Sequence, residues 1–109
     1  MRFKIIYSAM ARQDLRNIYE YIAHNLLVPK TASKLALRIM EEIRSLETMP
    51  MRYQLYEEEP WHTQGIRFFS VDNYLIFYLP DTTKNIVNIV RIMYGGRDIT
   101  KQLSENTIE

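Results

Sequence analysis

The sequence predicts an α+β domain in which a hairpin of two helices packs on one face of an antiparallel sheet. Apolar residues in the first half recur at helical spacing, about 3.6 residues per turn, on both sides of a break near Pro29. The second half carries three short runs rich in aromatic and β-branched residues, separated by turn residues, between Ile66 and Tyr94. The predicted order is a strand, the two-helix hairpin and a three-stranded antiparallel meander.

The first strand is predicted over residues 2–7, where apolar and basic side chains alternate. Phe3, Ile5 and Tyr7 share one face, and Arg2 and Lys4 share the other. This pattern is typical of a strand that is covered on one side only and lies near the edge of a sheet.

The first helix is predicted from Ala9 to about Asn25, with Ser8 as its N-cap. Its expected core stripe consists of Ala11, Leu15, Ile18, Tyr19, Ile22 and Leu26. Pro29 ends this helix, because the residue before a proline disfavours helical geometry, and the same proline can begin the next helix. The short connection indicates a helical hairpin.

The second helix is predicted from Pro29 to about Glu47, and Pro50 marks its end. Its expected core stripe consists of Ala32, Leu35, Ala36, Ile39, Ile43 and Leu46. Leu37 and Met40 are apolar but lie beside this stripe, so they are candidates for contact with something other than the sheet.

Residues 51–65 are the least regular part of the chain. A brief strand is expected over residues 52–56, followed by a loop over residues 57–65 that contains Trp61 and His62. After the meander, residues 99–103 are expected to form one helical turn, and residues 104–109 a polar tail. The chain is thus predicted to be a single domain over residues 1–103 with a short tail.

The meander begins with a tight hairpin at Asp72-Asn73, because both residue types tolerate a positive φ.

In the last strand of the meander, residues 86–94, simple alternation leaves apolar side chains on both faces. One face would carry Ile86, Val90 and Ile92, and the other Val87, Ile89 and Met93. This last strand of the meander is therefore predicted to be central in the sheet and covered on both sides.

Composition excludes several classes of function. The 109 residues contain no cysteine, so disulfides, thiolate chemistry and cysteine-based zinc sites are ruled out. No metal-binding or nucleotide-binding motif is present, and no cofactor is expected. No apolar run is long enough to cross a bilayer, so we expect a soluble, cytoplasmic protein without a membrane partner. The net charge of +1 leaves open both a nucleic-acid-binding stripe and an ordinary surface of mixed charge.

The remaining catalytic chemistry is metal-independent cleavage of RNA, which requires proton-transfer groups and cations that stabilise the phosphorane charge. Arg67, Arg91 and Arg97 come from the sheet and its end and could converge on one face, with Tyr94 or His62 transferring protons. Structural roles remain open for the same residues. Arg67 fits an ion pair or a surface position, Tyr94 fits packing at the core edge, and His62 fits a solvated loop.

Three segments together resemble the RelE/ParE superfamily of bacterial toxins. They are the first-helix segment ARQDLRNIYEYI at residues 11–22, the second-helix end IRSL at residues 43–46 before Pro50, and the strand segments that follow Arg67, namely NYLIFY at residues 73–78 and VRIMYGGRD at residues 90–98. The resemblance covers residues 3–103 and implies the toxin of a type II toxin–antitoxin pair, neutralised by a small antitoxin that wraps the toxin.

The resemblance also implies two alternative targets. RelE-like members cut mRNA on the ribosome with basic residues and often a C-terminal tyrosine or histidine, whereas ParE-like members poison DNA gyrase and lack that set. Arg97 matches one RelE arginine, but Leu75 stands where a strand arginine is expected and Leu103 near the tyrosine position. These departures favour the ParE-like branch, and the pair Arg97-Asp98 after Gly95-Gly96 also looks ParE-like. A structural role is open for the same pair, in which Asp98 caps the final turn and Arg97 pairs with a helix carboxylate such as Asp14 or Glu20.

Three hypotheses follow: a gyrase-directed toxin, a ribosome-dependent mRNA endonuclease that uses Arg67, Arg91, Arg97 and Tyr94, and a non-toxic interaction protein of the same fold. A cognate antitoxin is the expected partner under both toxin hypotheses. Apolar and aromatic residues outside the core stripes are candidates for its anchors, and each also fits ordinary core packing. These candidates are Leu37, Met40, Tyr53, Tyr56 and Trp61.

Overall fold

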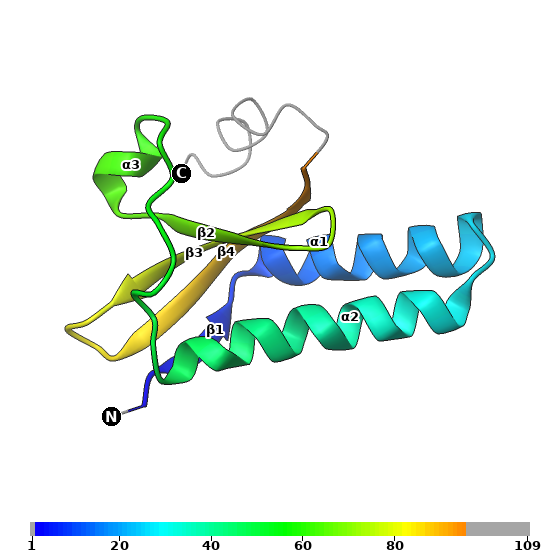
Figure 1. Cartoon of the computed structure of the whole chain (residues 1–109), viewed down its shortest axis with the longest axis horizontal. Coiled ribbons are helices and arrows are strands. Elements are labelled where there is room, and N and C mark those ends of the chain that lie inside the picture. The colour runs from blue at the N-terminus through cyan, green and yellow to red at the C-terminus, as the bar shows by residue number, and fades with distance from the viewer. Residues whose placement is uncertain (1, 96–109) are drawn as a thin grey trace.

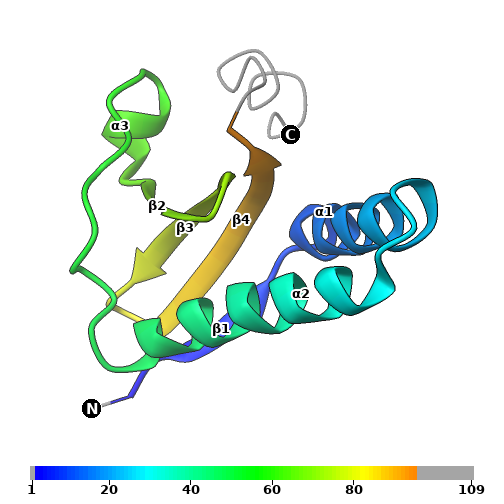
Figure 2. The same cartoon turned by 45° about the vertical axis from the view of Figure 1, so that its right-hand side comes forward.

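The structure is a computed structural model that describes residues 2–95, and it confirms the predicted α+β architecture (Figure 1). Its elements are β1 (Lys4–Tyr7), α1 (Ala9–Glu20), a π-helical turn (Tyr21–Asn25), α2 (Pro29–Arg44), a 3-10 turn (Ser45–Glu47), α3 (Trp61–Gln64), β2 (Arg67–Val71), β3 (Tyr74–Asp81) and β4 (Ile86–Tyr94). α1 and α2 form a hairpin on one side of the sheet (Figure 2). The expected turn at residues 99–103, Arg97 and the tail lie outside the described residues.

The four strands form one sheet in the order β1-β4-β3-β2. β2, β3 and β4 pair antiparallel, as the predicted meander requires. β1 pairs parallel with β4, from Lys4 opposite Ile86 to Tyr7 opposite Ile89. The helical hairpin therefore serves as the crossover connection that a parallel pair needs, and the first strand reaches the sheet edge that its alternating pattern predicts.

The hairpin turn at Asp72-Asn73 is confirmed, since Val71 pairs with Tyr74 directly across it. Asp72 has a φ of 54°, the left-handed conformation that aspartate tolerates better than most residues. Its carboxylate also lies 2.6 Å from Nη1 of Arg38 in α2. The turn is therefore tied to the helical layer by an exposed ion pair.

The first helix follows its predicted pattern up to its last turn. Ala11 and Ile22 are buried, but the side chain of Leu26 is 53% exposed, so its assignment to the core stripe was wrong. The reason is the π-helical turn, in which the amide of Leu26 donates to the carbonyl of Tyr21, five residues earlier. An extra residue in a turn rotates the following side chains by about 100° relative to an α-helix.

The second helix matches its predicted stripe more closely. It begins at Pro29 and ends at Arg44, and the 3-10 turn that follows carries the buried Leu46. Ala32, Ile39 and Ile43 are also buried. Together with α1, this stripe packs on the sheet face that carries Phe69, Val71, Ile76, Tyr78, Val87, Ile89 and Ile92.

A second, smaller core covers the opposite face of the sheet, where the sequence predicted only a loop. α3 ends at Gln64 and is capped by Gly65, which has a φ of 89°. Trp61, the first residue of α3, is only 2% exposed. Trp61 is buried with Ile66, Phe77 and Met93, and the ring of Tyr56 lies edge-on against Phe77 at 5.2 Å. The expected strand over residues 52–56 is reduced to one bridge, between Leu55 and Arg67.

A β-bulge in β4 changes which side chains share a face. Phe77 pairs with Arg91 and Tyr78 pairs with Ile89, so Val90 is the extra residue. Ile89 and Ile92 consequently both face the helices, whereas Val90 packs against the Trp61 core. The simple alternation predicted for residues 86–94 was wrong beyond Val90, although burial on both faces is confirmed.

Candidate functional site

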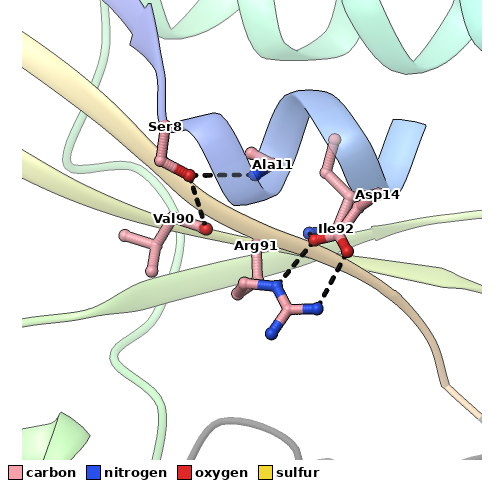
Figure 3. Close-up of polar contacts among 6 residues, drawn as sticks. All are labelled: Ser8, Ala11, Asp14, Val90, Arg91 and Ile92. Atoms are coloured by element: carbon pink, nitrogen blue, oxygen red, sulfur yellow. Dashed lines mark hydrogen bonds and ion pairs between the residues drawn. The ribbon is translucent and has the colours of Figure 1, made fainter. Parts of the chain in front are cut away.

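The β4 bulge is held by the residue that also begins α1 (Figure 3). The amide of Ser8 donates to the carbonyl of Ile89 at 2.9 Å. The Ser8 hydroxyl donates to the carbonyl of Val90 at 2.9 Å and accepts from the amide of Ala11 at 2.9 Å. The predicted N-cap is thus confirmed, and the same oxygen satisfies the carbonyl of the bulged residue.

One turn further along α1, Asp14 continues this contact with β4. Its carboxylate accepts from Nε of Arg91 at 2.7 Å, from Nη2 of Arg91 at 2.8 Å and from the amide of Ile92 at 3.0 Å. β1 ends opposite Ile89, and the carboxylate of Asp14 binds the free edge of β4 beyond that point (Figure 3). The helix carboxylate predicted to pair with Arg97 is therefore bound to Arg91.

This ion pair is largely shielded from water. The side chains of Arg91 and Asp14 are 8% and 13% exposed. Nη1 of Arg91 is buried and has no hydrogen-bond partner among the residues that the structure describes. A buried two-point arginine–carboxylate pair orients both groups strongly, so the geometry makes Arg91 a structural link between α1 and β4.

Arg67 is held in a different place, at the start of β2. Its Nη1 donates to the carbonyl of Tyr53 at 2.6 Å and lies 3.4 Å from the carbonyl of Met51. Arg67 therefore fastens the segment that follows α2 to the sheet. The neighbouring Tyr78 hydroxyl, which donates to the carbonyl of Pro50 at 2.8 Å, does the same.

The predicted convergence of arginines is wrong for the two that the structure describes. Arg67 shares its strand face with Phe69, which packs towards the helices. Arg91 lies directly opposite Phe77, whose ring belongs to the Trp61 core on the other face. Alternation along each strand thus places the two guanidinium-bearing residues on opposite sides of the sheet.

The predicted proton-transfer groups are also apart. Tyr94 is 46% exposed and lies against the ring of Tyr74 at 5.7 Å, at the Asp72 end of the sheet, whereas Arg67 lies at the other end of β2. His62 is exposed, with Nδ1 3.5 Å from the carboxylate of Glu59. Hydrogen bonds from Thr63 to that carboxylate lower the pKa of Glu59, and His62 adds to this effect.

The family model for the ParE toxin of the type II toxin–antitoxin system parDE matches residues 5–99. The chain belongs to this family. The match spans both helices and the whole sheet, including the Ser8, Asp14 and Arg91 contacts. No curated protein matches the sequence of this ParE-family toxin closely enough to count as a relative.

Solved structures that share the fold of this toxin include the following three. A chain from the chromosomal ParDE toxin–antitoxin system of P. aeruginosa is 20% identical, with a TM-score of 0.70 over 85% of this chain and 96% of that chain. A chain from the RelBE toxin–antitoxin complex of Mycobacterium tuberculosis is 18% identical, with a TM-score of 0.61 over 86% and 99%. A mutant of the E. coli RelE toxin in the free state is 10% identical, with a TM-score of 0.68 over 100% of both chains.

The five candidate anchors for a partner fall into two groups in this toxin. Leu37 and Met40 are 59% and 38% exposed on α2. Tyr53 and Tyr56 are partly buried, and Tyr53 stacks on Phe69 with ring centroids 4.4 Å apart. With Trp61 buried in the second core, only the two α2 residues among these five are exposed.

A shallow groove lies beside the outer edge of β2, around the ring of Tyr53. It has a volume of about 450 Å³ and is lined by Arg52, Tyr53, Gln54, Phe68, Phe69 and Ser70. The guanidinium of Arg52 sits 5.1 Å from the centroid of the Tyr53 ring. This groove combines an aromatic wall with a cation at its rim.

The end of the helical hairpin carries the exposed apolar residues that sequence reasoning missed. The exposed fractions are 53% for Tyr21, 53% for Leu26, 77% for Leu27 and 42% for Val28. The available signal was three consecutive apolar residues directly before Pro29. That signal was overlooked because Leu26 was assigned to the helix core.

Neither a membrane-spanning helix nor a metal site occurs among the residues that the structure describes. None of the described helices is long and apolar enough to cross a membrane. Within the same residues, there is no group of three or more histidine, cysteine, aspartate or glutamate side chains arranged to hold a metal ion.

Proposed function

We propose that this toxin inhibits growth by binding DNA gyrase, without catalysing a reaction, and that a cognate antitoxin neutralises it. Membership of the ParE family supports this proposal. The observation that carries it is the state of Arg91, whose guanidinium is bound at two points by Asp14 and is 8% exposed.

An RNA-cleaving toxin needs cations that can reach the phosphate of a bound message. Arg91 is committed to Asp14, and Arg67 is committed to backbone carbonyls on the opposite face of the sheet. Breaking the Arg91 pair to reach a phosphate would leave the shielded Asp14 carboxylate without its partner, which is costly. Releasing Arg67 would break its hydrogen bond to the partly buried carbonyl of Tyr53. These positions favour a mechanism based on protein contacts over one based on phosphodiester cleavage.

Two assays with purified toxin separate the proposed targets. We expect gyrase-dependent breaks in supercoiled DNA, with ribosome-loaded mRNA left intact. Cleavage of mRNA only when it is loaded on ribosomes, with no DNA breaks, would instead establish the endonuclease alternative. Normal growth of cells that express the folded chain without antitoxin would support the third hypothesis, a non-toxic interaction protein.

Tyr94→Phe tests the endonuclease alternative at a single atom. The variant removes an exposed hydroxyl and keeps the ring against Tyr74. Under the gyrase proposal, growth arrest is unchanged by Tyr94→Phe and by the control Tyr56→Phe, which removes a hydroxyl and keeps the ring against Phe77. Loss of arrest in Tyr94→Phe alone would show that the Tyr94 hydroxyl takes part in the chemistry.

For the antitoxin, we propose that Leu37 and Met40 on α2 are its anchors, with the groove beside Tyr53 as a further contact. Their exposure supports this choice, because a few side chains that become buried on binding commonly account for much of the binding energy at an interface. We expect Leu37→Asp to weaken antitoxin binding by about tenfold or more in titration calorimetry. Thr31→Asp adds the same charge on another face of α2 and should bind normally.

A further inference from the structure

The end of the helical hairpin is a second exposed apolar surface, distinct from the α2 face that carries Leu37. We call it the hairpin tip and define it by Tyr21, Leu26, Leu27 and Val28. Figures 1 and 2 show this end of the α1–α2 hairpin projecting beyond the sheet. The tip is therefore presented to solvent at a distance from both main cores.

The hairpin tip rests on a small core of its own. Ile22, Ala23 and Ala32 are buried together, with Ile18, Tyr19 and Leu35 packed around them, and all of these residues belong to the helices. The tip side chains are thus supported by packing beneath them. Substituting the tip side chains would therefore leave the packing between the helices and the sheet largely intact.

Leu27 is costly within the described structure in two ways. Its φ of 59° is a left-handed conformation, which is unfavourable for a residue with a Cβ. Leu27 is also 77% exposed, so its side chain gains little stabilisation from packing against the rest of the toxin. A strained backbone and an exposed leucine in one residue point to a role outside the folded monomer.

Charge indicates the character of the partner. Residues 21–40 contain Lys30, Lys34 and Arg38 and no acidic residue. Arg38 is bound to Asp72, whereas neither Lys30 nor Lys34 takes part in an ion pair among the described residues. A symmetric contact between two copies of this chain would bring these lysines together, so an acidic partner fits better than a second copy.

We infer that the hairpin tip is the surface by which this toxin engages its protein target, and that Leu27 inserts into an apolar pocket rimmed by acidic side chains. This inference rests on the proposed function in one respect, that the target is a protein. Lys30 and Lys34 steer and orient the encounter, and burial of Leu27 provides the anchor.

The test uses Leu27→Asn, because asparagine tolerates a left-handed φ and removes the apolar anchor. We expect the variant to fold normally by circular dichroism and to bind antitoxin as the wild type does. The toxin level that halves the growth rate should rise about tenfold. Lys30→Glu combined with Lys34→Glu should act in the same direction.

Met49→Asn is the control, since it also replaces an exposed apolar side chain with asparagine at a position outside the tip. Its growth arrest in cells without antitoxin should equal that of the wild type. Arrest by Leu27→Asn at the wild-type toxin level would overturn the inference. So would loss of antitoxin binding by Leu27→Asn, which would make the tip an antitoxin surface.

A lipid partner is examined by flotation with vesicles of anionic phosphatidylglycerol. Binding of the wild type to these vesicles, lost in Leu27→Asn together with growth arrest, would assign the tip to a membrane and overturn the inference. Arrest by the wild type without gyrase-dependent DNA breaks contradicts the gyrase proposal alone, because the tip is scored by arrest itself. A wild type that does not arrest growth would contradict both.

Discussion

At the scale of the residue, Arg91 and Asp14 carry the most consequential contact in the toxin. Removing either partner leaves the other charge in a site with little water. We expect Asp14→Ala to lower the free energy of unfolding by about 3–5 kcal/mol, measured by urea denaturation. Asp14→Leu combined with Arg91→Met, which leaves no charge behind, should cost clearly less. A single variant as stable as the wild type would contradict this account.

The same pair illustrates the limit of sequence reasoning about the site. The sequence identified Arg91 as a candidate and named Asp14 as a carboxylate able to bind an arginine. It did not join the two, because they lie 77 residues apart and meet only through the register of β4. The burial of Trp61 was missed for a similar reason. Nothing in the neighbouring residues indicates that a tryptophan in a predicted loop covers the second face of the sheet.

At the scale of the element, the sequence correctly predicted the features that depend on interactions between residues close together in the chain. The N-cap at Ser8, the core stripe of α2 and the turn at Asp72-Asn73 all follow from neighbouring residues, and the structure confirms each. The bulge at Val90 has no comparable local signature. It arises where β3, β4 and Ser8 meet, so the alternation of β4 beyond Val90 could not be predicted from β4 alone.

Ser8 offers a direct test of how the elements are joined. Ser8→Ala removes both the cap on α1 and the donor to the Val90 carbonyl, so we expect a loss of about 1–3 kcal/mol in the free energy of unfolding. Ser8→Thr keeps the hydroxyl and should lose much less. Equal stability of the two variants in urea denaturation would show that the hydroxyl contacts contribute nothing.

At the scale of the whole molecule, the toxin should lose stability in alkali through Tyr78. Burial raises the pKa of Tyr78 from 10.0 to about 12. Above pH 10 the unfolded chain therefore releases the proton of this hydroxyl while the folded chain retains it, so stability declines from pH 10 towards pH 12. Urea midpoints across this range should fall less steeply in Tyr78→Phe. An identical decline in both proteins would contradict the assignment.

The parallel pairing of β1 with β4 also bears on how the toxin is made. Residues 4–7 find their partner strand only at residues 86–89, so β1 stays unpaired until those residues have been synthesised. Contacts this distant along the chain form slowly, because a long loop must close first. A nascent fragment that stops before β4 lacks the strand that joins both halves of the sheet. The cell therefore meets a folded toxin only after β4 has been translated.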